Sequence, residues 1–204
     1  MTEHRQHHEP QAQESEQDFW DARYRESDRV WSGNANAVLV QEAEGLPAGR
    51  VLDLGCGEGA DSVWLALERA AEHAAEAGVA DRIDFQRHDL GESFPSGEFD
   101  LVSACFLHSP HAGMERERIL RTAAGAVAPG GILLIVGHAG WPSWKENPHP
   151  DVRFPTPEEV VAELELPQGQ WEVLLCEEYE RVQPMPDGRP GVRADNTVKV
   201  RRLP

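Results

Sequence analysis

The period of the hydrophobic positions changes along the chain, and each change predicts an element. Two continuous apolar runs, 99–108 (FDLVSACFLH) and 132–139 (ILLIVGHA), are typical of strands buried on both faces. The run 50–59 (RVLDLGCGEG) begins in the same way and is then interrupted by three glycines at alternate positions. Apolar and polar residues alternate over 81–90 (DRIDFQRHDL), and this period of two predicts a further strand.

Helical spacing fills the intervals between these strands. We expect helices over about 17–26, 34–45, 61–77, 114–127 and 156–165. The last of them has the clearest start, because Thr156 can cap the helix, Pro157 can occupy its first position and Glu159 can reach back to the cap. The sequence PGG at 129–131 predicts a turn before the strand at 132–139.

The chain closes with two strand-like segments, 171–182 and 196–203, on either side of the turn-rich PMPDGRPG (184–191). This arrangement predicts an antiparallel hairpin. Strands that alternate with helices and are continuously apolar predict a parallel α/β sheet, which the hairpin completes. In such a sheet, ligands bind at the carboxyl ends of the strands.

The composition predicts one domain with a tail. Residues 1–16 contain almost no large apolar side chains and are expected to be disordered, whereas residues 17–204 form one domain with a helical cap over 17–48. The chain has no signal-peptide pattern and no apolar segment long enough to span a membrane. Its three cysteines are odd in number and lie far apart in the sequence, so we expect reduced thiols in a cytoplasmic protein.

The formal net charge of the 204 residues is −17. A chain of this charge is repelled by nucleic-acid backbones and by anionic membranes, so we expect neither as a partner. A small-molecule partner fits better, with the protein as a monomer or homodimer.

Four motifs follow one another in the order of a known enzyme family. They are VLDLGCGEGAD (51–61), HDL (88–90), FDLVSACFLH (99–108) and APGGILLIVGHA (128–139). This series resembles the class I S-adenosylmethionine-dependent methyltransferases. Upstream, Trp20, Tyr24, Trp31 and Asn34 form a pattern similar to the N-terminal cap of the tellurite-resistance and thiopurine type, which methylates small molecules. By this resemblance Trp20 and Trp31 would close the cofactor pocket; plain packing is the alternative for both.

The resemblance implies a Rossmann-like three-layer sandwich, with a mostly parallel sheet and a C-terminal antiparallel hairpin. It also implies S-adenosylmethionine as methyl donor and a small-molecule acceptor. Gly55, Cys56 and Gly57 would pass their backbone beside the methionine part of the cofactor, and Asp53 would lie near its amino group. Glycines at these positions let the backbone approach a ligand closely.

The later motifs carry the remaining cofactor contacts that the resemblance implies. Asp89 and Leu90 would face the adenine, although Asp89 could instead cap a turn. Cys105 and Phe106 would line the cofactor at the end of their strand.

Methyl transfer to a soft acceptor such as sulfur needs little acid–base help, so positioning and exclusion of water would carry most of the rate. An oxygen or nitrogen acceptor would want a base. His108 is the best-placed candidate for this catalytic role and His138 the second. We predict no metal site, because Pro110 disfavours a helix that would present His108 and His111 together.

The largest departure from the family lies near Leu67. About 15 residues are missing there, including the second strand and the acidic residue that normally binds the cofactor ribose. One hypothesis is that the strand 82–90 moves beside the strand 50–54, which would bring Asp89 to the ribose. The alternatives are a pocket that binds cofactor weakly or not at all, and a natural sequence with residues that are missing here.

Two other functions compete with the methyltransferase interpretation. One is a non-catalytic cofactor-binding or interaction protein, descended from such enzymes and impaired by the shortened segment. The other is a nicotinamide-dependent dehydrogenase. The dehydrogenase interpretation fits less well. The glycine turn of such enzymes spaces its last two glycines by three positions, whereas Gly57 and Gly59 are two positions apart.

Overall fold

A computed structural model of the chain describes residues 16–26, 34–57, 60–61, 65, 84, 86–108, 114–145 and 152–204. Its elements, in chain order, are α1 (Glu16–Arg25), α2 (Ala37–Ala43), β1 (Val51–Asp53), β2 (Phe99–Cys105), α4 (Arg116–Gly125), β3 (Val127–His138), α5 (Pro157–Glu163), β4 (Trp171–Pro184) and β5 (Pro190–Arg202). The N-terminal tail predicted over 1–16 lies outside these residues except for Glu16, which begins α1.

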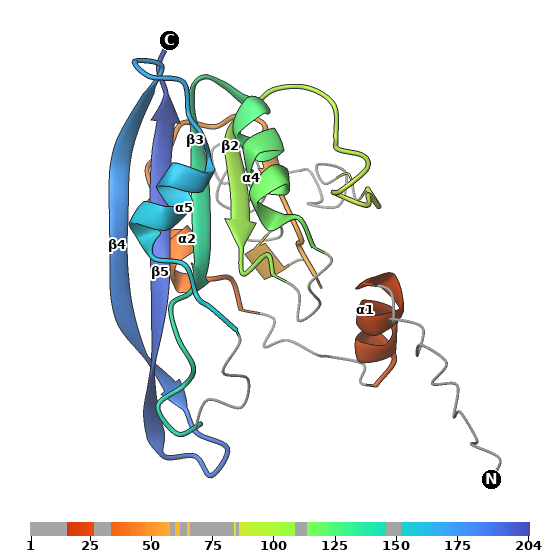
Figure 1. Cartoon of the computed structure of the whole chain (residues 1–204), viewed down its shortest axis with the longest axis vertical. Coiled ribbons are helices and arrows are strands. Elements are labelled where there is room, and N and C mark those ends of the chain that lie inside the picture. Colours follow the sequence, from red (N-terminus) through yellow and green to blue (C-terminus); the bar gives the residue numbers. More distant parts are fainter. Residues whose placement is uncertain are drawn as a thin grey trace, which may run out of the picture.

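Five strands form one sheet in the order β1-β2-β3-β5-β4 (Figure 1). The pairs β1–β2 and β2–β3 are parallel, while β5 runs antiparallel to both β3 and β4. Four strands therefore share one direction, and the predicted sheet with its C-terminal hairpin is confirmed. The carboxyl ends of β1, β2 and β3 lie at one edge, where ligands bind in sheets of this kind.

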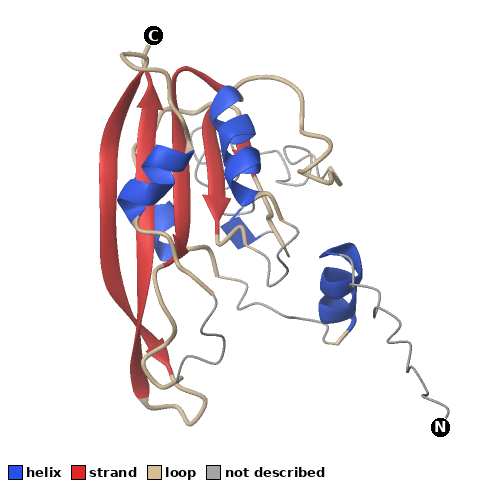
Figure 2. Ribbon diagram, viewed as in Figure 1, coloured by secondary structure: helices blue, strands red, loops and turns tan. Residues whose placement is uncertain are grey.

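Helices cover both faces of the sheet, with α4 and α5 in front and α2 behind (Figure 2). The front core joins Leu120 and Ala123 of α4 and Val160 of α5 to the inward side chains of the strands. The rear core joins Leu39 of α2 and the helical Leu65 to the opposite side chains. The three-layer sandwich is confirmed, since β2 and β3 pack apolar side chains on both faces of the sheet.

Local signals account for several boundaries. The capping box of α5 is present: Thr156 Oγ1 accepts from the Glu159 amide at 3.2 Å, and the Glu159 carboxylate accepts from the Thr156 amide at 2.9 Å. The turn predicted at 129–131 is instead part of β3, which pairs irregularly with β2 at this point. Gly130 has φ +81° there, a conformation that glycine adopts without strain.

The strand predicted over 81–90 is wrong for the residues that the structure describes in it, 84 and 86–90, which have coil or turn conformation. Within the described chain β1 is an edge strand paired only with β2, so no strand occupies the place beside it. The helix predicted over 61–77 is confirmed at Asp61 and Leu65, while most of it lies outside the described residues.

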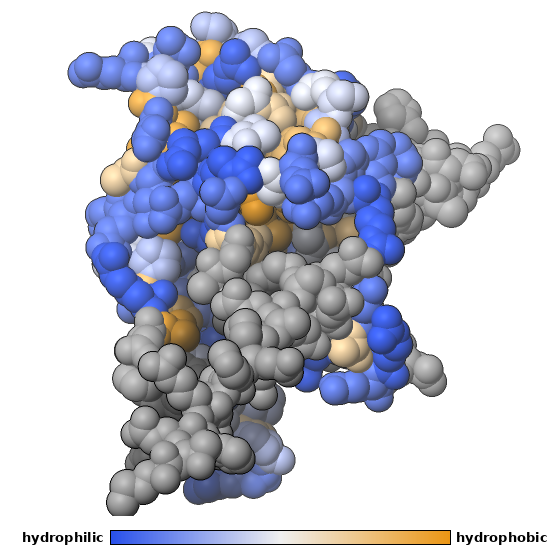
Figure 3. All heavy atoms as spheres, turned by 45° about the vertical axis from the view of Figure 1, so that its right-hand side comes forward, coloured by the Kyte–Doolittle hydropathy of each residue, from blue (hydrophilic) through white to orange (hydrophobic). Residues whose placement is uncertain are grey.

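The surface visible in Figure 3 is largely hydrophilic, and its apolar side chains occur in small separate areas. None of the helices in the described ranges is both long and apolar enough to cross a bilayer.

Candidate cofactor and acceptor site

The glycine turn after β1 has the backbone geometry that the sequence predicts. Gly55 and Gly57 have φ angles of +70° and +54°, which residues with a side chain rarely adopt. A Cβ at Gly55 would lie 2.9 Å from Leu107 Cδ1, so the turn also needs glycine for space. Beside it, Asp53 accepts a hydrogen bond from Ser103 Oγ at 2.9 Å, which orients the carboxylate at the end of β1. Cys56 is partly buried within the turn.

Asp61 connects this turn to the cap. Its carboxylate accepts a hydrogen bond from the Asn36 amide at 2.5 Å, and Asn36 caps α2 through bonds to the amides of Val38 and Leu39. Burial raises the pKa of Asp61, against the hydrogen bonds from Asn36 and Cys105 that lower it. Asp61 belongs to the first motif, but the sequence pattern alone assigns it no role.

Cys105 lies at the end of β2, where the resemblance puts a cofactor contact. Burial raises the pKa of its thiol well above the ordinary value, and the neighbouring Asp61 and Asp53 raise it further. The side chain is therefore a neutral thiol at physiological pH and not a nucleophile.

Phe106 follows directly and has φ +53°, an uncommon conformation for a residue with a side chain. Its amide donates to the Val136 carbonyl at 2.8 Å, which anchors the residue to β3. Its ring lies 4.5 Å from the ring of His138, centroid to centroid. Strained residues at strand ends often accompany function, and here the strained residue lines a cleft.

Asp89 and Leu90 lie in a turn. The Asp89 carboxylate accepts from the Gly91 amide at 3.0 Å, and its carbonyl accepts from the amides of Glu92 and Ser93. The turn-capping alternative for Asp89 is thus present in the structure. Leu90 packs partly buried against the front core.

The cap residues are only partly described. Trp20 lies on α1, with its ring centroid 6.2 Å from that of Tyr24. Figure 1 shows α1 set apart from the sheet, and the ion pair between Asp21 and Arg87 connects it to the segment before Asp89. Trp31 lies outside the described residues, so its predicted place over the pocket stays a prediction.

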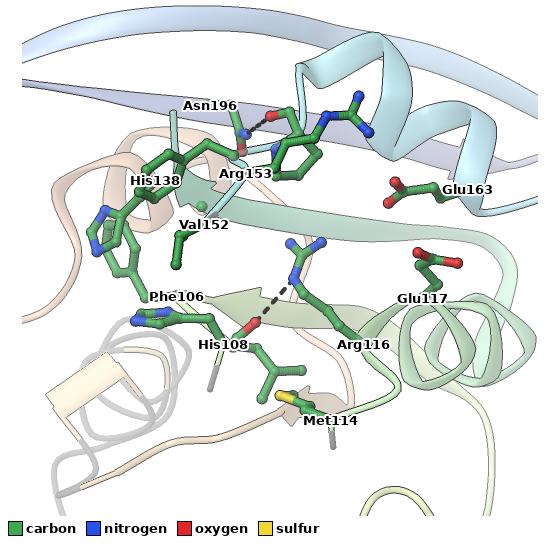
Figure 4. A pocket seen from close by; sticks show the side chains of 14 residues that line it. Phe106, His108, Met114, Arg116, Glu117, His138, Val152, Arg153, Glu163 and Asn196 are labelled. Atoms are coloured by element: carbon green, nitrogen blue, oxygen red, sulfur yellow. Dashed lines mark hydrogen bonds between the residues drawn. The ribbon is translucent and has the colours of Figure 1, made fainter. Parts of the chain in front are cut away.

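A cleft of about 370 Å³ opens beyond Phe106, at the carboxyl ends of β2 and β3. Figure 4 shows Phe106, His108 and His138 together at one end, Glu117 and Glu163 at the other, and the Arg116 guanidinium between them. Residues 152–155, before α5, form the opposite wall. The cleft is thus polar in its middle and aromatic where it meets the predicted cofactor residues.

His138 has a carboxylate partner. Its Nδ1 lies 2.7 Å from Asp195 Oδ1, and the second oxygen of Asp195 accepts a hydrogen bond from Arg181 Nε. The Asp195 side chain is fully buried, and that of His138 is 15% exposed. Burial tends to raise the pKa of Asp195, but the hydrogen bonds from His138 and Arg181 lower it below its ordinary value.

His108 lies beside His138, with 5.2 Å between the ring centroids. Burial lowers the pKa of its imidazole, and His138 lowers it further. No carboxylate within the described ranges forms an ion pair with it. The structure therefore supplies the second candidate base, His138, with the partner that the first candidate lacks.

Arg116, the first residue of α4, points into the cleft. Its Nε donates to the Leu107 carbonyl at 3.0 Å, and the charges of Glu163 and Glu117 favour the charged guanidinium. Nearby, Asn196 Oδ1 is buried without a described partner, while the other end of that amide donates to the Pro155 carbonyl at 2.9 Å. Asn196 Oδ1 thus remains to be satisfied at the floor of the cleft.

Sequence reasoning missed Asp195, Arg181, Arg116 and Asn196. The one signal for the first and last was the polar run 195–197 (DNT) at the start of the strand predicted over 196–203, where buried polar residues need partners. The described ranges contain no group of three or more His, Cys, Asp or Glu that could hold a metal ion.

The comparison with known families assigns the central part of this fold. Residues 52–135, from β1 through most of β3, match the methyltransferase domain family. The family match agrees with the order of the motifs and of the strands. Over these residues the chain is similar to methyltransferase domains, and the order of its strands agrees with that likeness.

Two curated relatives align with about half of the chain. Ribosomal RNA small subunit methyltransferase C of Chromohalobacter salexigens is 35% identical over 127 residues, which are 53% of this chain and 38% of that protein. An uncharacterized protein of a Synechococcus strain is 34% identical over 125 residues, or 52% of this chain and 29% of that protein. The chain thus spans well under half the length of either relative.

Solved structures cover the whole fold. One match is a structure that concerns the conversion of a disulfide bond into a thioacetal group during echinomycin biosynthesis. Its TM-score is 0.58 at 22% identity, and the match covers 91% of this chain and 92% of that one. TehB from Haemophilus influenzae matches with a TM-score of 0.56 at 19% identity, covering 93% and 67%. At these identities the likeness concerns the fold alone.

Proposed function

We propose that this protein transfers the methyl group of S-adenosylmethionine to a small molecule bound in the cleft. One observation carries the proposal. The residues that the resemblance assigns to the cofactor end at Phe106, and the cleft begins at the same residue. A donor on one side of Phe106 and an acceptor on the other would be neighbours, as an in-line displacement requires.

The turn fits the cofactor that the family implies. Gly55 and Gly57 have positive φ angles, and a side chain at Gly55 would enter the space of Leu107. Asp53, held by Ser103, would bind the amino group of the methionine part, and Cys56 would contribute its backbone. When bound, the cofactor supplies an electrophilic methyl group on a sulfonium.

The other predicted cofactor contacts remain part of the proposal. Cys105 and Phe106 would line the cofactor at the end of β2, Leu90 would face the adenine, and Trp20 and Trp31 would cover the pocket. Asp89 would bind the adenine amino group with the carboxylate oxygen that its turn leaves free. The route by which Asp89 would replace the missing ribose ligand lacks support, because residues 86–90 do not pair with β1 as a strand.

The acceptor cleft favours a compound with an anionic group. Arg116 is partly buried, and burial lowers its pKa against the opposing effect of Glu163 and Glu117. A guanidinium removed from water gains most from a bidentate carboxylate or similar anion. The acidic pair at the far end would exclude an anion from that side and so orient the acceptor.

Cofactor binding tests the proposal directly. Calorimetric titration with S-adenosylmethionine and with S-adenosylhomocysteine should show one site per chain, and Asp53→Ala should weaken it at least tenfold by removing the carboxylate. Glu180→Gln, an exposed change on β4, is the matched control and should bind as the wild type does. An intact fold that binds neither compound would overturn the proposal and favour a non-catalytic descendant.

The named relative favours a second acceptor, ribosomal RNA. The net charge of −17 opposes it, because binding to a phosphate backbone depends on basic side chains. Methyl transfer to ribosomal RNA from cells lacking the protein would support that alternative, and strong salt dependence should accompany it.

A further inference from the structure

We propose that His138, held by Asp195, is a general base, and that the acceptor therefore carries a hydroxyl or amine proton that it loses on methylation. This inference rests on the proposed methyl transfer and names the class of its acceptor. It departs from the soft acceptors that the resemblance suggests, for which no base is needed.

The hydrogen bond determines which imidazole nitrogen carries the proton. A carboxylate only accepts, so the contact of 2.7 Å between Asp195 Oδ1 and His138 Nδ1 requires the proton on Nδ1. In the neutral ring Nε2 is then a bare acceptor. The one hydrogen bond found for this ring among the described residues is at Nδ1, and His138 lines the cleft.

The surroundings of the pair hold Asp195 in place. Arg181 donates to its second oxygen, and the same guanidinium lies over the Phe106 ring, 5.9 Å from the centroid. Removing a carboxylate completely from water is costly unless its hydrogen bonds are satisfied. Here the satisfied carboxylate supports one histidine at the mouth of a cleft, an arrangement typical of catalytic histidines.

His138 is also in the protonation state that a base needs. Burial lowers its pKa below the ordinary value, and Arg193 and Arg181 lower it further, while Asp195 raises it through the hydrogen bond and its charge. The ring is thus neutral at pH 7 and can take up a proton. Once protonated, the imidazolium is stabilised by the Asp195 carboxylate, which remains ionised.

In the proposed methyl transfer, the acceptor proton and the electron pair of the broken bond each have a place to go. As the acceptor oxygen or nitrogen forms its bond to the methyl carbon, the acceptor proton moves to His138 Nε2. The electron pair of the broken sulfur–methyl bond stays on the sulfur, which becomes neutral. His138 then releases the proton to water at the open side of the cleft.

Three matched acceptors separate the chemistry: 4-hydroxybenzoate, 4-aminobenzoate and 4-mercaptobenzoate. All share a carboxylate for Arg116 and differ in the atom that is methylated. Wild-type protein should methylate the hydroxyl or amine compound, and His138→Gln should lower kcat for it about 100-fold or more with KM nearly unchanged. Glu180→Gln, an exposed change on β4 away from the cleft, is the control and should retain the activity of the wild type. Methylation of the thiol alone, or of none of the three while cofactor binds, would overturn the proposal.

A second readout needs no turnover. In the free protein, nitrogen-15 NMR at pH 7 should show His138 neutral with its proton on Nδ1. The Asp195→Asn change removes a negative charge beside the imidazole, so it should lower the pKa of His138 further. With a hydroxyl acceptor, the acidic limb of kcat/KM in that variant should shift to lower pH. A doubly protonated His138 at pH 7, or a proton on Nε2, contradicts the assignment whether or not the variant folds. Failure of cofactor binding would instead identify a failure of the proposed function itself.

Discussion

At the scale of single residues, two kinds of constraint meet around the cleft. Gly55 is constrained by its backbone, since its positive φ disfavours a side chain and an added Cβ would also displace the Leu107 side chain. Asp195 is constrained by its surroundings, because only the hydrogen bonds from His138 and Arg181 make a fully buried carboxylate tolerable. The first constraint is visible in the sequence as a glycine turn, whereas the second depends on residues far away in the chain.

Gly55→Ala should destabilise the protein by about 1–3 kcal/mol, because a left-handed backbone and a Cβ 2.9 Å from Leu107 Cδ1 both disfavour a side chain. Gly45→Ala is the matched control, with a similar φ of +75° and nothing within 4 Å of the added Cβ. Urea unfolding of both variants measures the difference. Equal losses would mean that the contact with Leu107 is relieved without cost.

At the scale of elements, a helix begins where the sequence predicts it when the residues at its end form a clear capping pattern. The helix α5 begins at the Pro157 that the capping pattern predicts. The strand predicted over 81–90 failed because alternation reports only that one face of a segment is apolar. A strand also needs a partner, and the described residues of this segment instead close a turn around the Asp89 carboxylate and carbonyl.

Thr156→Ala should lower the free energy of unfolding by about 1 kcal/mol, because it removes the bond of 3.2 Å to the Glu159 amide. Thr156→Ser keeps an oxygen at the same place and should lose much less. Thermal and urea unfolding at pH 7 compare the two. A serine variant as unstable as the alanine variant would show that the methyl group, and not the cap, matters.

At the scale of the whole molecule, sheet order decides which residues share the site. Placing β5 between β3 and β4 sets Asp195 opposite His138, although 57 positions separate them in sequence. The same order brings Arg181 of β4 to the other side of Asp195. The two histidines at this edge, His108 and His138, also couple the stability of the molecule to pH.

The free energy of unfolding should fall as pH drops from about 6.5 toward 5. Burial lowers the folded-state pKa of His108 and His138, so the unfolded chain binds protons in this window that the folded chain does not. Each such proton lowers stability by up to about 1.4 kcal/mol per pH unit. The raised pKa values of Asp61 and Glu163 act in the opposite sense.

Urea unfolding of the wild type and of His108→Gln/His138→Gln between pH 5 and 7.5 tests this linkage. The double variant should show a flatter profile than the wild type over the same range. Parallel profiles would mean that both histidines titrate in the folded protein as they do in the unfolded chain.

The sequence by itself determined the class of fold, the glycine turn, the α5 cap and the terminal hairpin, because these depend on local backbone preference and on the period of apolar residues. It also pointed to the histidines at the strand ends. Only the tertiary structure decided that His138 rather than His108 has a carboxylate partner, and that Arg116 and Asn196 face one cleft. Such pairings depend on strand order and register, and these arise from packing across the whole sheet rather than from any local segment.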